Sequence, residues 1–150
     1  MESSTPAHVL VVAHRTAATT GLRDAVSRRV AAGHARFTLL VPRTAHGLHR
    51  IMDPEDQDDS EAREILTRAL PLLSEAAGSP VDGLIGDPAP LTAIEDALNR
   101  ETYDEIILST LPTHLSRWLR LDLPRKVAAF GIPVTTVTPV ESESAVVDAR

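Results

Sequence analysis

Short apolar runs alternate with longer amphipathic segments along most of the chain. Five of these runs are rich in β-branched or aliphatic residues and have the length of β-strands. They cover residues 8–13, 36–41, 81–86, 105–109 and 134–138. Between the runs, apolar residues recur at helical spacing. The pattern predicts a strand followed by a crossover helix, repeated along the chain.

Proline and capping residues set several of the expected helix bounds. One helix is expected to begin at Ser60, and Pro71 within it predicts a kink or a break. Another is expected to begin with Asp87 as its cap and Pro88 as its first residue. The segment 43–58 is polar and has no periodicity, so we expect a flexible loop there.

The strand pattern also indicates the fold class. Strands that are almost entirely apolar are typical of a parallel sheet buried on both faces. Right-handed crossovers then give a doubly wound, Rossmann-like α/β sheet of five strands with helices on both faces. The 150 residues suit one domain, residues 1–150, with a core at about 8–139 and a flexible tail at 140–150.

Composition excludes several classes of partner. The net charge is −6, but six carboxylates lie within Asp53–Glu61, which leaves 15 acidic and 15 basic residues elsewhere. Aromatic residues make up 3% of the chain and there is no basic stripe, so we expect no nucleic-acid partner. No apolar run is long enough to cross a bilayer, and the amino terminus lacks a secretory pattern. We therefore expect a cytoplasmic protein without a membrane partner.

Two polar segments follow the first and fourth predicted strands, at 13–16 and 109–114. In doubly wound sheets, ligands bind outside the carboxyl ends of the strands, where the strand order reverses. The side chains here suit a phosphate or carboxylate. In an alternative interpretation, the hydroxyls satisfy strand-end backbone groups and the arginines are solvated. The candidate ligand-binding residues are His14, Arg15, Thr16, Ser109, Thr110, Thr113, Ser116 and Arg117.

The sequence assigns no catalytic residue and no metal site. His14 has the chemistry of an acid or base, but no carboxylate partner is evident for it. His46 and His49, followed by Asp53, have a spacing that would suit a divalent metal in a helix. They lie in the predicted polar loop, so we expect no metal there.

The order of elements resembles that of the universal stress protein family. The segment Gly86–Ala89 is similar to a Gly-Asp-Pro turn that is frequent in that family, and residues 125–134 are similar to its last helix and strand. The resemblance covers about residues 8–139. It implies a sheet order of 3-2-1-4-5 and commonly a dimer.

The nucleotide-binding members of that family carry Gly-x2-Gly-x9-Gly-Ser/Thr after the fourth strand. The same spacing here places Leu108, Leu111 and Leu121 at the three glycines and Asp122 at the hydroxyl residue. Backbone amides of such glycines bind phosphate, whereas leucines crowd it and a carboxylate repels it. The turn at His14 also lacks the acidic residue often found there in the family. ATP or another adenine nucleotide is therefore disfavoured as a cofactor.

Three functions remain open. The leading hypothesis is a universal stress protein-like regulatory or small-ligand-binding domain that is not an enzyme and does not bind ATP in the usual family manner. A second is a nucleotide or phosphoester-processing enzyme that uses His14, Arg15, Ser109 and Arg117. A third is a dimeric interaction protein whose pocket is closed by leucines. The last strand, Val134–Thr138, is a charge-free sheet edge, and it predicts a homodimer.

Overall fold

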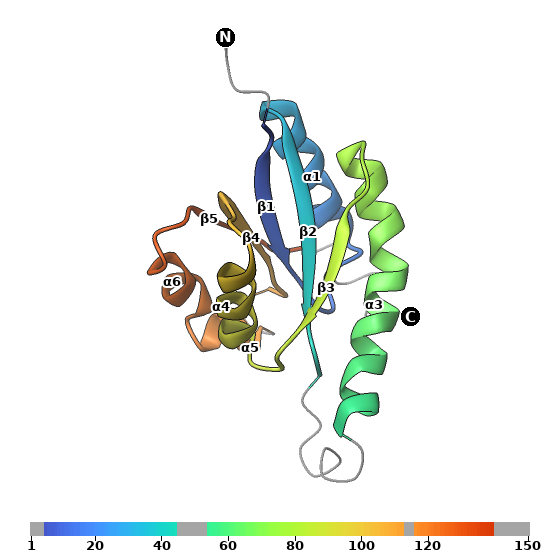
Figure 1. Cartoon of the computed structure of the whole chain (residues 1–150), viewed down its shortest axis with the longest axis vertical. Helices are drawn as coiled ribbons and strands as arrows, with labels where there is room; N and C mark the ends of the chain where they lie inside the picture. Colours follow the sequence, from blue (N-terminus) through green and yellow to red (C-terminus); the bar gives the residue numbers. More distant parts are fainter. Residues whose placement is uncertain (1–4, 45–53, 113–115, 140–150) are drawn as a thin grey trace.

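The computed structural model describes residues 5–44, 54–112 and 116–139, and the side chains of 54–58 are left out of the description (Figure 1). At its centre is a five-stranded sheet in the order β3-β2-β1-β4-β5. Every pair of neighbouring strands is parallel. The predicted fold class and strand order are confirmed. The strands are β1 (Ala7–Val12), β2 (Ala35–Pro42), β3 (Asp82–Gly86), β4 (Glu105–Ser109) and β5 (Val134–Val137).

Helices cover both faces of the sheet. Figure 1 shows α1 and α3 on one face and α4, α5 and α6 on the other. Within the described ranges, no helix has the length and apolar composition needed to cross a membrane. The helices are α1 (Thr20–Ala32), α3 (Pro54–Ala77), α4 (Pro90–Arg100), α5 (Arg117–Arg120) and α6 (Leu123–Ala128).

The central strand β1 explains the two-layered core. Its side chains alternate between the faces, as they must in any strand. Val9 and Val11 pack with residues of α1 and α3, while Leu10 and Val12 pack with residues of α4 and α6. All four are fully buried. The continuous apolar run in the sequence therefore reflects a strand that is covered on both sides.

The start of α3 corrects the sequence interpretation. The helix begins at Pro54 rather than at a Ser60 cap, so the predicted loop over 43–58 is too long. A proline is well placed in the first turn of a helix, because its missing N–H has no partner there in any case. The acidic residues that follow suit the positive end of the helix dipole. The residues ahead of Ser60 are polar and give the helix no apolar face there, so the spacing of apolar residues did not predict this first part of it.

Pro71 does not break α3, which runs without interruption from Pro54 to Ala77. An internal proline removes one backbone hydrogen bond and strains the preceding turn. On either side of it, Ala69 and Leu73 are buried against the sheet, and Pro71 itself is exposed. Packing of the apolar face on the sheet outweighs the local cost, so the predicted break is wrong.

The start of α4 also differs from expectation. The helix begins at Pro90, and its cap residue, Ala89, makes no side-chain hydrogen bond. Asp87 forms a turn before the helix instead, because its Oδ1 accepts the Ala89 N–H at 2.9 Å. Pro88 lies in that turn. Pro90, rather than the expected Pro88, is therefore the first residue of the helix.

The last helical region is divided ahead of Pro124 into α5 and α6, and residues 113–115 lie outside the described part. The chain turns at Asp122, whose φ of 62° and ψ of 37° are left-handed. Asp tolerates this conformation better than most residues that carry a side chain. Arg125 Nε lies 3.2 Å from Asp122 Oδ2 across the turn.

Candidate functional site

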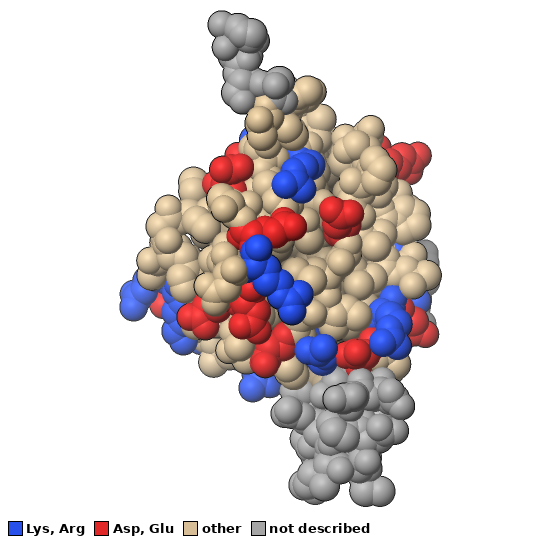
Figure 2. Space-filling model, in the orientation of Figure 1, with Lys and Arg blue, Asp and Glu red and all other residues tan. Residues whose placement is uncertain are grey.

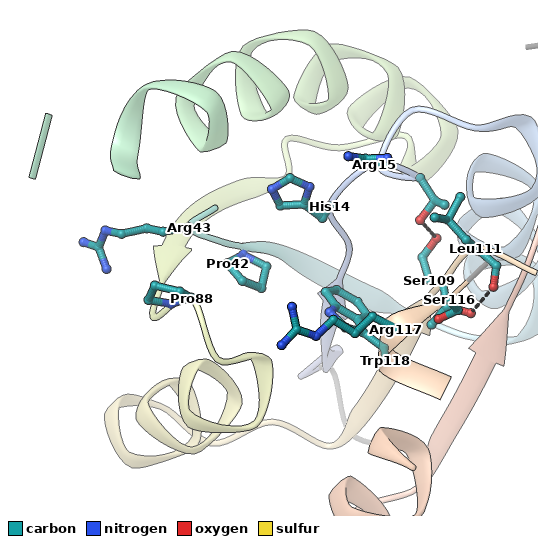
Figure 3. Close-up of a pocket in the computed structure, with 12 residues that line it drawn as sticks. His14, Arg15, Pro42, Arg43, Pro88, Ser109, Leu111, Ser116, Arg117 and Trp118 are labelled. Carbon is teal, nitrogen blue, oxygen red and sulfur yellow. Dashed lines mark hydrogen bonds between the residues drawn. The ribbon is translucent and has the colours of Figure 1, made fainter. Parts of the chain in front are cut away.

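A pocket of about 290 Å³ opens at the carboxyl ends of the central strands (Figure 3). The pairing of Val12 with Leu108 makes β1 and β4 neighbours, so the segments that follow them lie side by side. The end of β2 and the turn between β3 and α4 complete the wall. The pocket therefore lies at the switch point that the doubly wound fold predicts.

The structure brings most of the predicted residues together at this pocket. Thr113 lies outside the described residues, as do His46, His49 and Asp53. Among the residues that the structure does describe, no cluster of three or more His, Asp or Glu is arranged to hold a metal ion. The predicted residues that line the pocket are His14, Arg15, Thr16, Ser109, Thr110, Ser116 and Arg117.

Sequence analysis missed part of the wall. Pro42 and Arg43 come from the end of β2, and Pro88 comes from the turn before α4. The same rule that selected the ends of β1 and β4 would have found them if applied to every strand. Trp118 both contacts the core between the sheet and α4 and lines the pocket.

Some hydroxyl hydrogens of buried residues at the pocket have no hydrogen-bond acceptor among the described residues. Thr16 Oγ1 and Ser109 Oγ are 2.5 Å apart, and the two residues are only 3% and 2% exposed. One hydrogen bond between two hydroxyls uses one of their two hydrogens. Ser116 is 3% exposed, and its Oγ accepts the Leu119 N–H at 3.1 Å. Neither the second hydrogen of the pair nor that of Ser116 has an acceptor among the described residues.

Thr110 behaves differently from these hydroxyls. Its Oγ1 donates to the carbonyl oxygen of Leu111 at 3.0 Å. The interpretation in which the hydroxyls only satisfy strand-end backbone groups therefore fits Thr110. It does not account for Thr16 and Ser109, whose hydroxyls bond to each other, whereas Ser116 caps α5 by accepting the Leu119 N–H.

Positive charge surrounds the pocket. Arg15 and Arg117 are exposed and approach it from different sides (Figure 3). In the described part of the chain, neither is paired with a carboxylate. Arg43 is paired with Asp59 of α3. No Asp or Glu is found among the described lining residues, so the pocket presents donors and cations.

His14 has the carboxylate connection that the sequence did not reveal. Its Nε2 lies 3.0 Å from Thr44 Oγ1, and the Thr44 hydroxyl donates to Glu61 Oε1 at 2.6 Å. Burial lowers the pKa of His14 below its ordinary value, and Arg15 adds to this while Glu61 opposes it. His14 is therefore neutral at about pH 7.

The four positions that replace the family's phosphate loop have different environments. Leu108 is 0% exposed and belongs to the core beneath α4 and α6. Leu111 lines the pocket, whereas Leu121 and Asp122 do not. Leu121 is 50% exposed. The three leucines do not fill the pocket together, so the closed-pocket interpretation is wrong.

A second buried histidine lies far from this pocket, near the beginning of β1. His8 Nε2 lies 2.9 Å from Thr38 Oγ1, and its ring lies 4.2 Å from the ring of Tyr103, centre to centre. Glu101 Oε1 is 3.4 Å from Nδ1, yet Nδ1 makes no hydrogen bond. Burial lowers the pKa of His8, and Arg36 contributes in the same direction.

The surface charges in view show no basic tract. Figure 2 shows blue and red side chains interspersed over the described part of this face.

Comparison with known proteins places the fold. Neither a family model nor a curated protein matches the sequence. Among solved structures, a universal stress protein in complex with cAMP has a TM-score of 0.58 and 17% identity, over 89% of this chain and 98% of that chain. A universal stress protein from Archaeoglobus fulgidus has a TM-score of 0.61 and 14% identity, over 87% and 93%. A hypothetical protein has a TM-score of 0.63 and 18% identity, over 89% and 97%.

The sheet order and the pocket define a doubly wound α/β domain with its candidate site at the strand switch point. Within that class, the fold is that of the universal stress proteins. The fold implied by the sequence resemblance is thus confirmed.

Proposed function

We propose that this universal stress protein-like domain binds a small ligand with an oxyanion group in the pocket between β1 and β4. Its role is regulatory or ligand-binding rather than enzymatic. The ligand is held by hydroxyls and guanidiniums of this chain and not by a glycine-rich ATP loop.

The spare hydroxyl hydrogens carry this proposal. A buried hydroxyl without an acceptor is costly, and a ligand oxygen would remove that cost. Ser116 and the pair Thr16 and Ser109 supply these donors. Charged acceptors form the stronger hydrogen bonds, and Arg15 and Arg117 add charge at the rim. One structural neighbour holds cAMP, whose phosphate has this chemistry.

The leucine at position 111 supports a binding mode different from the ATP loop. In the family pattern this position is a glycine, whose amide can approach a phosphate closely. Here Leu111 lines the pocket, and Asp122 lies outside it in an exposed turn. Side-chain donors therefore replace backbone amides in the proposed site.

Removing either rim arginine tests the proposal. We expect Arg15→Ala and Arg117→Ala each to weaken the binding of cAMP or inorganic phosphate by about tenfold, because each removes a charged hydrogen-bond donor. Isothermal titration calorimetry measures the affinities. Arg100→Ala, at the exposed end of α4, is the matched control and should leave them unchanged. Equal affinities for all four proteins, or no binding of either anion, would refute the proposed site.

We also propose that the domain forms a homodimer through β5. This strand pairs with β4 along one edge, and no other described strand pairs with it. Thr135 and Thr136 are exposed. Unprotected strand edges favour pairing with a second chain.

A proline at position 136 tests the dimer. The Ile106 and Thr110 N–H groups donate to the carbonyls of Pro133 and Val137, so the alternating pattern directs the Thr136 backbone to the open edge. Thr136→Pro should therefore abolish pairing across this edge and keep the pairing with β4. Thr136→Val retains the N–H and should remain dimeric. Light scattering after size exclusion reports the mass, and a Thr136→Pro dimer or a wild-type monomer would exclude this interface.

A further inference from the structure

We infer that His14 selects oxyanions that carry a proton, because Thr44 and Glu61 hold its ring as a hydrogen-bond acceptor. His14 contacts the ligand, and the other two are positioning residues. This inference rests on the proposed binding function and names the class of oxyanion that the pocket takes.

The hydrogen bonds fix the tautomer of His14. An ionised carboxylate only accepts hydrogen bonds, so the Thr44 hydroxyl gives its one hydrogen to Glu61. The Thr44 oxygen can then only accept from His14, which puts the ring hydrogen on Nε2. In a neutral ring the other nitrogen, Nδ1, carries a lone pair.

Nδ1 of His14 is available to a ligand. It has no hydrogen-bond partner among the described residues, and it is not among their buried, unpartnered atoms. His14 itself lines the pocket (Figure 3). The hydroxyls and guanidiniums around it offer hydrogens. The neutral imidazole nitrogen is thus an acceptor without a hydrogen of its own, beside hydroxyls and guanidiniums that can donate.

Burial keeps this nitrogen unprotonated near neutral pH, because it lowers the pKa of His14. Arg15 and Arg117 face the pocket, and Arg43 at the end of β2 is paired with Asp59. Among the charged groups, Glu61 of α3 raises the pKa of His14 and Arg15 lowers it by a smaller amount, so burial decides the direction of the shift. The acceptor state therefore holds above the His14 pKa and is lost as the pH falls through it.

Comparing the binding of hydrogen phosphate with that of sulfate distinguishes hydrogen bonding to His14 from electrostatic attraction by the arginines. At about pH 8 both are present mainly as dianions of similar size, but hydrogen phosphate keeps one O–H group and sulfate has none. The O–H group can donate to Nδ1, whereas a sulfate oxygen would meet the lone pair. We expect wild-type protein to bind phosphate about tenfold more tightly than sulfate at about pH 8.

Protonation should remove the preference. Below the pKa of His14, Nδ1 gains a hydrogen and becomes a donor, which suits a sulfate oxygen. The preference for phosphate should therefore fall as the pH is lowered, by more than the conversion of hydrogen phosphate to its monoanion accounts for. Attraction by the arginines alone would leave this preference without a dependence on His14.

Thr44 variants test the positioning role. Thr44→Val keeps the shape of the side chain and removes the hydroxyl, so the tautomer is no longer fixed and the phosphate preference should fall several-fold. Thr44→Ser retains the hydroxyl and should restore the preference. Nitrogen-15 NMR of the free protein should show the Nε2–H tautomer of His14 in wild type and Thr44→Ser but not in Thr44→Val. His8, held by Thr38, is the internal control.

The outcomes distinguish the two proposals. If neither anion binds wild-type protein, the proposed function and this inference both fail. If both anions bind equally, or Thr44→Val keeps the wild-type preference and tautomer, the oxyanion site stands and the selective role of His14 is overturned.

Discussion

Gly86→Ala should lower the free energy of unfolding by about 1–3 kcal/mol, the range for overpacking a well-packed core. A Cβ on Gly86 would lie 2.7 Å from the Cβ of Ala93 and 2.9 Å from Cδ1 of Leu40. The Ala93 Cβ is bonded directly to the backbone of α4, so relief requires the helix to move. We therefore expect a loss near the upper end of this range.

Gly83→Ala is the matched control within the same strand. Its added Cβ would meet the methyl ends of Leu70 and Leu66 at 3.0 and 3.1 Å, and these flexible side chains can rotate away. Neither glycine of β3 has a positive φ, so the comparison isolates packing from backbone strain. Urea unfolding of the three proteins gives the two differences. Equal losses would contradict a close approach specific to Gly86.

The same glycine connects the fold to the pocket. The Gly86 carbonyl accepts the Arg43 N–H at 2.9 Å, and Pro88 follows two residues later in the pocket wall. A shift of α4 would displace this wall. Gly86→Ala should therefore also weaken anion binding, although the substituted residue does not line the pocket.

The sequence predicted the sheet well because each strand is a local pattern. The run 105–109 is apolar and short, and the structure places β4 at those residues. Burial on both faces leaves little choice of residue type in such strands. The start of α3 escaped prediction because a helix there needs no apolar periodicity before it reaches the sheet.

The sequence could predict only those residues of the candidate site that lie at the end of a strand. His14 and Ser109 were found because each lies at the end of a strand that reaches the switch point, His14 just after β1 and Ser109 as the last residue of β4. The link from His14 through Thr44 to Glu61 was not, because it depends on where α3 crosses the edge of the sheet. Periodicity gives no information on which side chains of one element face the loop of another.

Two leucines that stand where the universal stress protein pattern has glycines lie in different surroundings, one in the core and the other in the pocket wall. Leu108 is fully buried among Leu10, Leu40 and Ile106. Leu111, three residues later, is half-buried at the pocket. The two leucines occupy the first two glycine positions of the phosphate loop, yet only the second borders the space where a ligand would bind.

Leu108→Ala should consequently lower the free energy of unfolding by about 2–5 kcal/mol, since it leaves a cavity in the core. Leu111→Ala should cost less than about 1.5 kcal/mol, because its side chain is partly in solvent and the pocket can take up the change. Urea unfolding measures both, and calorimetry with phosphate should show that Leu111→Ala still binds. Equal losses from the two substitutions would place Leu108 outside the core. A large loss from Leu108→Ala alone would show that the side chain at this position serves the core, whereas the side chain of Leu111 serves the pocket wall.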